Sequence, residues 1–134
     1  MDTHWRTRGY LPHRNEQSLV QHIVFNLADA FPNSRSDFVR HEERLAWADA
    51  ELDLGHGAQL LRKRESALIV ENCILRDHGA RYALAAWCIM PNHVHVVIEQ
   101  FPGHDLSTII QTWKSVTAHA INKRERRQGQ LWQR

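Results

Sequence analysis

Two histidines separated by a single residue, His93 and His95, are the side chains of this sequence best suited to do chemistry. They lie in the run His-Val-His-Val-Val-Ile at 93–98, whose β-branched residues favour a strand. Successive side chains of a strand point to opposite faces, so both imidazoles would share one face, with Cα atoms about 7 Å apart. Two imidazoles at that spacing can bind one divalent metal ion.

The neighbouring residues predict the elements that position this pair. Pro91-Asn92 is typical of a turn, so we expect the strand to begin near His93 and to run to residue 100. Residues 82–90 form a second apolar run, which predicts an antiparallel hairpin with 93–100. Asn92 could also orient His93, although its residue type favours the turn role.

A further strand and several helices are predicted elsewhere in the chain. Residues 19–27 form an apolar strand run, and Ser36 or Asp37 could begin a helix that continues to about residue 53. A short helical turn is expected at 58–62, and a helix at 65–77. The clearest helix follows Asp105, with apolar residues at i, i+3, i+4 and i+7 spacing: Leu106, Ile109, Ile110, Trp113, Val116, Ala120 and Ile121.

This order predicts an α+β fold, in which helices pack on one face of a small antiparallel sheet. The nearest simple pattern is the split β-α-β motif of ferredoxin-like folds. The 134 residues suit one domain spanning 1–134, with a polar arm at 1–18 in which Gly9 and Pro12 interrupt regular structure. A fourth strand could lie within 1–12 or near the C-terminus.

Charge is distributed unevenly along the chain. Residues 105–134 carry a net charge of +4 and residues 1–14 carry +2, whereas the middle of the chain is net negative. The two basic ends could form a phosphate-binding surface, or they could be solvated tails. Cys73 and Cys88 are expected to be small buried hydrophobes in a reducing compartment. No secretory signal and no apolar run of about 20 residues is visible, so we expect a cytoplasmic protein that does not span a membrane.

The segment Trp-Cys-Ile-Met-Pro-Asn-His-Val-His at 87–95 resembles the single-tyrosine HUH transposases, whose metal site carries the Met-Pro-Asn-His-Val-His motif. The resemblance is closest to the REP-associated tyrosine transposases. Similar blocks occur in the family's order at four further places: residues 8–13, 19–30, 113–115 and 129–133.

The resemblance implies a HUH endonuclease type of fold and a single-stranded DNA substrate that often contains a hairpin. His93 and His95 would be the catalytic metal ligands, holding Mg²⁺ or Mn²⁺ to polarise the scissile phosphate. A tyrosine from a C-terminal helix would attack the phosphorus and form a covalent link to DNA. Members of the broad family are monomers or homodimers.

One departure from the family pattern concerns the nucleophile. The family's tyrosine follows the Trp132-Gln133 block on a terminal helix, and this sequence ends at Arg134. Its two tyrosines, Tyr10 and Tyr82, do not match that position, and Tyr82 is expected to lie in the core. Taken alone, the chain is expected to bind metal and DNA without cleaving by the family route.

Seven residues are candidates for DNA contact: Arg8, Lys114, Lys123, Arg124, Arg126, Arg127 and Trp132. The basic side chains would contact phosphates, or would be exposed helix residues. Trp132 could stack on a base, or pack in the protein interior.

Two other functions remain open. The first is a nucleic-acid-binding remnant that kept the fold and lost the chemistry. The second is a nucleotide hydrolase of the histidine-triad type, in which histidine alternates three times along a strand. Val97 occupies the third position here and argues against it.

Overall fold

A computed structural model describes residues 5–8, 11–14, 19–30, 55 and 57–134 of the chain. The elements follow in the order β1 (Trp5–Arg8), β2 (Leu11–Arg14), β3 (Val20–Asn26), η1 (Ala28–Ala30), η3 (Leu60–Arg62), α2 (Arg64–Arg76), β4 (Tyr82–Ile89), β5 (His93–Gln100) and α3 (Leu106–Glu125), where η denotes a short 3-10 helix. The predicted helix from residue 36 or 37 to about 53 lies outside the described residues.

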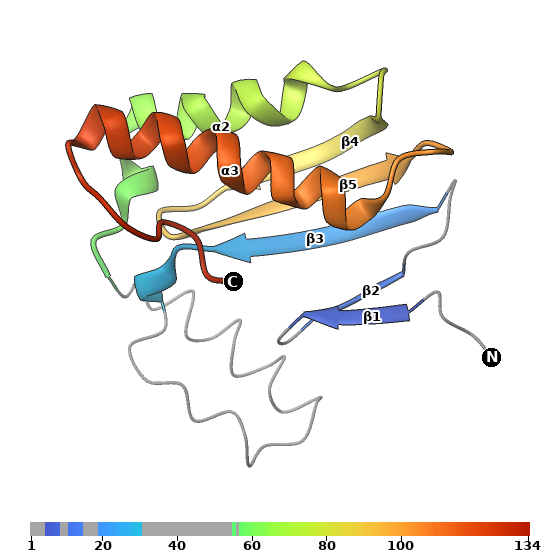
Figure 1. The fold of residues 1–134 in the computed structure, drawn as a ribbon, viewed down its shortest axis with the longest axis horizontal. Coiled ribbons are helices and arrows are strands. Elements are labelled where there is room, and N and C mark those ends of the chain that lie inside the picture. The colour runs from blue at the N-terminus through green and yellow to red at the C-terminus, as the bar shows by residue number, and fades with distance from the viewer. Residues whose placement is uncertain (1–4, 9–10, 15–18, 31–54, 56) are drawn as a thin grey trace, which may run out of the picture.

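The centre of the fold is a three-stranded antiparallel sheet with the strand order β3-β5-β4. Strands β4 and β5 form the predicted hairpin, closed by a hydrogen bond of 2.8 Å from the Met90 N–H to the His93 carbonyl. Helices α2 and α3 lie side by side over one face of this sheet (Figure 1). The α+β class and the one-sided helical cover are therefore confirmed.

Local signals set the ends of α3. The Asp105 carboxylate accepts a hydrogen bond of 3.3 Å from the Thr108 N–H and so caps the helix that the sequence predicts after Asp105. At the other end Arg126 adopts a left-handed conformation with φ of 52°, and its N–H bonds to the carbonyls of Asn122 and Lys123. This conformation stops the helix and turns the chain back toward the sheet (Figure 1).

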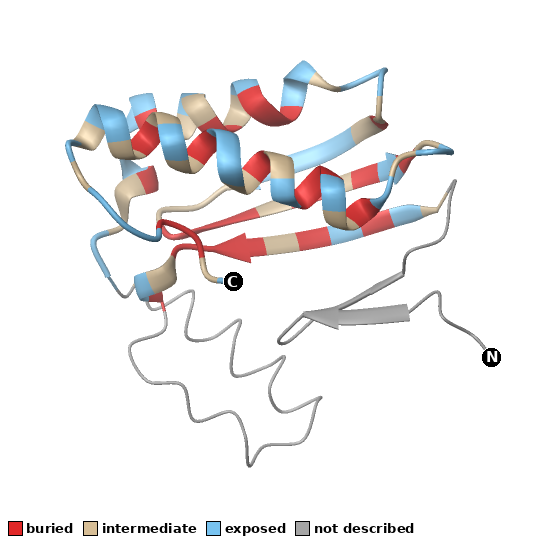
Figure 2. Ribbon diagram, viewed as in Figure 1, coloured by how far each residue is buried: buried red, intermediate tan, exposed pale blue. Residues whose placement is uncertain are grey.

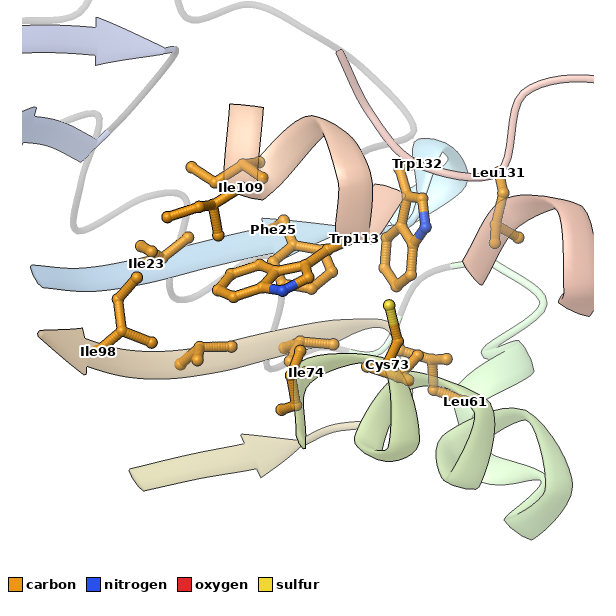
Figure 3. Packing of buried hydrophobic residues seen from close by; sticks show 14 of the residues in the cluster. Ile23, Phe25, Leu61, Cys73, Ile74, Ile98, Ile109, Trp113, Leu131 and Trp132 are labelled. Carbon is orange, nitrogen blue, oxygen red and sulfur yellow. The ribbon is translucent and has the colours of Figure 1, made fainter. Parts of the chain in front are cut away.

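The core fills the space between the helices and the sheet. Val94, Val96 and Ile98 of β5 are fully buried on the face that the helices cover. Burial differs between the strands of the sheet. Figure 2 shows buried residues along β3 and β5 and exposed residues along much of β4, which lies at an edge of the sheet. In Figure 3 the rings of Phe25, Trp113 and Trp132 lie together, with Phe25 4.8 Å from Trp132 between centroids.

Tyr82 is the core tyrosine that the sequence predicted. Its hydroxyl donates a hydrogen bond of 2.6 Å to the Ile74 carbonyl and accepts one of 3.0 Å from Nε1 of Trp113. Burial raises the pKa of this phenol to about 12. A phenol held in this way is a structural group and not a nucleophile.

Two strands lie within the segment predicted as a polar arm. They are β1 and β2, which pair with each other as a separate two-stranded sheet. Pro12 lies within β2 opposite Thr7, because a two-stranded ribbon has outer edges on which a missing N–H is tolerated. Neither end of the described chain adds a full fourth strand to the central sheet, although Trp132 forms a single bridge with Leu27.

The two cysteines differ in their surroundings. Cys73 of α2 is buried, as predicted, and burial raises the pKa of its thiol. Cys88 is exposed, which corrects the expectation of a second buried thiol. The reason is its place on the edge strand β4, opposite His95 on the face away from the helices. Among the described helices, none has the length and apolar character needed to cross a membrane.

Candidate metal centre

His93 and His95 lie on the face of the sheet opposite the helices. Their partners on β3 are Asn26 and Val24, respectively, while the intervening Val94 faces the core. The centroids of the two imidazole rings are 5.0 Å apart and the ring planes meet at 73°. The β-strand alternation thus brings both rings to one place, at the end of the sheet where β5 begins.

Asn92 holds the ring of His93. The side-chain oxygen of Asn92 lies 2.8 Å from Nδ1 of His93, and both residues are buried, with only 2% of His93 exposed. The Asn92 carbonyl also accepts a hydrogen bond of 2.9 Å from the Leu27 N–H, which ties the turn to the chain just after β3. Asn92 therefore performs both roles considered for it. An N–H at Nδ1 of His93 makes Nε2 the nitrogen through which this ring would bind a metal.

His95 contacts a third histidine, which the sequence analysis missed. Nε2 of His22 lies 3.0 Å from Nδ1 of His95, and the two rings meet end to end, with centroids 5.3 Å apart and planes at 20°. His22 is an exposed residue of β3, paired with Val97. Its position in the predicted strand 19–27 was visible, but only the register between β3 and β5 shows which residue it meets.

The geometry of the pair fits one divalent ion. An imidazole nitrogen binds such an ion at about 2.1 Å, which puts the ion about 3.2 Å from the ring centre. Two rings on one ion, at angles between octahedral and tetrahedral, then have centroids about 4.5–5.2 Å apart. The separation of 5.0 Å between His93 and His95 falls inside this range. Within the described residues no group of three or more His, Cys, Asp or Glu side chains is placed to hold a metal.

The C-terminal segment reaches the same end of the sheet. The Gln133 N–H donates to the Asn26 carbonyl at 2.9 Å, and Asn26 is the partner of His93. Lys114 of α3 donates a hydrogen bond of 2.9 Å to the Gln133 carbonyl. A groove of about 500 Å³ runs between α3 and this segment, lined in part by Lys114, Ser115 and Gln130.

Only some of the predicted DNA-contacting residues lie together in the structure. Lys123, Arg124, Arg126 and Arg127 lie at the C-terminal end of α3, which Figure 1 places at the same end of the sheet as the start of β5. Two of them contact protein groups, since Arg124 lies 3.6 Å from Glu65 and Arg127 donates to Asn122 at 2.7 Å.

The two remaining candidates are Arg8 and Trp132. Arg8 belongs to β1. Trp132 is 4% exposed, and its Nε1 donates a hydrogen bond of 2.8 Å to the Thr117 hydroxyl. The packing alternative therefore describes Trp132, because a buried indole presents no face for a base to stack on.

A sheet with helices on one face and paired histidines on the other is the arrangement expected of a transposase of the HUH class. A family model described as "Transposase IS200 like" matches residues 59–134, more than half of the chain. The chain therefore belongs to the IS200-like transposase family. The matched segment contains α2, β4, β5, α3 and the C-terminal segment, including both histidines. No curated protein and no solved structure matches the chain.

Proposed function

We propose that this transposase domain binds single-stranded DNA and uses Mg²⁺ or Mn²⁺ held by His93 and His95 to assist strand cleavage and transfer. The observation that carries this proposal is the 5.0 Å, near-perpendicular arrangement of the two rings on a face that no described helix covers. The bound ion would polarise a phosphate oxygen and stabilise charge that develops on it. The protein residues would hold the two ligand rings and bind the DNA backbone.

The nucleophile in this proposal is a tyrosine at the position where the family pattern has it, after the block that matches Trp132-Gln133. The preferred substrate is a single strand beside a hairpin, as in the REP-associated branch, and the Met-Pro-Asn-His-Val-His motif at 90–95 supports that assignment. The basic residues at the end of α3 would contact phosphates that flank the hairpin. The protein would act as a monomer or a homodimer.

Metal binding tests the first half of the proposal. Titration of the protein with Mn²⁺, followed by calorimetry and by electron paramagnetic resonance, should show one site that is lost in His95→Ala. The matched control is His119→Ala, because His119 is an exposed histidine of α3 away from the pair. Equal Mn²⁺ affinity in wild type and His95→Ala would refute the proposed site.

Reaction with DNA tests the second half. A longer form of the protein that carries a tyrosine after the Trp132-Gln133 block should form a covalent adduct with labelled hairpin DNA only when Mg²⁺ or Mn²⁺ is present. Hairpin binding without any adduct from that longer protein would favour the alternative, a binding module without chemistry. Nucleotide hydrolysis without DNA would favour the histidine-triad alternative, although Val97 occupies the next position of β5 on that face, where the triad pattern requires a histidine.

A further inference from the structure

We propose that His22 is a positioning residue for the metal centre, and that it holds His95 in the tautomer whose Nε2 can bind a cation. This inference rests on the proposed role of His95 as a ligand. The hydrogen bond that carries it, however, joins two side chains of the protein itself and can be measured in metal-free protein, so it can be tested separately.

The fold brings the two histidines together from distant parts of the sequence. They are 73 residues apart and meet because β3 and β5 pair with Val24 opposite His95. His22 is then the diagonal neighbour of His95 on the same face, at a separation that long side chains can bridge. The 3.0 Å contact fixes which nitrogens meet, and the centroid separation of 5.3 Å with ring planes at 20° means that the two rings meet end to end and nearly coplanar, as a straight hydrogen bond requires.

The contact between His22 and His95 determines which nitrogen of the neutral His95 ring carries the proton. One ring nitrogen carries a proton and the other carries a lone pair, so a ring that binds metal through Nε2 must carry its proton on Nδ1. Ligating histidines almost always donate that second N–H to an acceptor. Nε2 of His22 lies where such an acceptor must be. If His22 donated instead, the proton of His95 would lie on Nε2 and block metal binding.

The same arrangement indicates that His22 positions His95 and does not itself bind the metal. Nε2 of His22 faces a nitrogen of His95, and this nearly coplanar, end-to-end geometry differs from the near-perpendicular geometry of His95 and His93. The described residues also contain no three-ligand cluster. His22 therefore supports His95 in the way that Asn92 supports His93, with each partner contacting Nδ1 of its ring.

Two substitutions separate the parts of the interaction. His22→Phe keeps an aromatic ring of similar shape but removes the acceptor. His22→Gln removes the ring but supplies an amide oxygen that can accept from Nδ1. His119→Phe is the matched control for loss of an exposed histidine. All four proteins are compared at one pH, after circular dichroism has shown that they are folded.

Proton–nitrogen correlation NMR of the metal-free proteins gives the direct measurement. Wild type, His119→Phe and His22→Gln should show His95 protonated at Nδ1, whereas His22→Phe should show a mixture of tautomers. Mn²⁺ affinity should fall about 10-fold or more in His22→Phe and stay near the wild-type value in His22→Gln.

Three results would overturn the inference: a wild-type His95 protonated at Nε2, an unchanged tautomer and Mn²⁺ affinity in His22→Phe, or pulsed paramagnetic resonance showing His22 nitrogen bound to Mn²⁺. Absence of Mn²⁺ binding in wild type would instead refute the proposed function. The NMR measurement would still decide whether His22 sets the tautomer of His95.

Discussion

Asn26 and Gln133 are joined by two hydrogen bonds. The Gln133 N–H donates to the Asn26 carbonyl at 2.9 Å, and the Asn26 side-chain amide donates to Oε1 of Gln133 at 2.6 Å. Since Asn26 pairs with His93 across β3 and β5, this link fixes the C-terminal segment next to the candidate metal centre.

Lys114 should control how firmly that segment is held. Lys114→Met removes the donor to the Gln133 carbonyl but keeps an apolar stem on α3. We expect faster hydrogen exchange at the N–H groups of Ala28 and Gln133, which bond across the segment, with a change of only about 1 kcal/mol or less in global stability. Lys123→Met, an exposed position on the same helix, is the control. Equal exchange in both variants would show that Lys114 does not hold the segment.

Asn92 should affect metal binding through His93. Asn92→Leu removes the acceptor at Nδ1 of His93, so Mn²⁺ affinity is expected to fall about 10–100-fold, as measured by calorimetry on folded protein. Asn92→Asp keeps an oxygen at that position and should retain binding. The proposed support for His93 is wrong if Asn92→Leu binds Mn²⁺ as tightly as Asn92→Asp does.

Trp132 should contribute mainly to stability. Trp132→Ala empties a buried site against Phe25 and leaves the Thr117 hydroxyl without its indole donor, so we expect a loss of about 3–5 kcal/mol in the free energy of unfolding. Trp87→Ala is the comparison, because Trp87 is 39% exposed on the edge strand, and it should cost about 1 kcal/mol. Denaturant unfolding measures both. A small cost for Trp132→Ala would contradict its burial.

Tyr82 should lose its phenolic proton at a higher pH in the folded protein than in the unfolded chain. Burial raises its pKa from the ordinary value of 10 to about 12, so the folded protein keeps this proton at a pH where the unfolded chain loses it. Its contribution to stability is therefore complete below pH 10 and is lost as the pH rises through 12. Absorbance titration of Tyr10→Phe, which leaves Tyr82 as the one tyrosine, should show a midpoint well above that of the same protein in denaturant. Coincident midpoints would contradict the buried phenol.

The basic residues at the C-terminal end of α3 should contribute to the salt dependence of DNA affinity. Lys123 and Arg126 are exposed, and neutralising either one by substitution with Gln should lower the slope of log affinity against log salt by about 1. Lys63→Gln is the control, since Lys63 already pairs with Glu125 at 2.6 Å. Unchanged slopes in both test variants would place the DNA elsewhere.

Much of the fold could be predicted because its signals are local. The β-branched run after Pro91-Asn92 gave the bounds of β5, and the carboxylate of Asp105 gave the start of α3. The β1–β2 hairpin was missed because Pro12 argues against a strand wherever a ladder hydrogen bond is required. Cys88 was misplaced because an apolar run does not show whether its strand lies at the edge of a sheet.

For the site, the sequence alone determined that His93 and His95 share a face, since alternation is a property of a single strand. Only the tertiary structure decided what surrounds them. Pairing of β3 with β5 brought His22 to His95, and packing against Phe25 buried Trp132. Such contacts depend on strand register and on the closure of a core between residues far apart in the chain, which no local pattern of residues specifies.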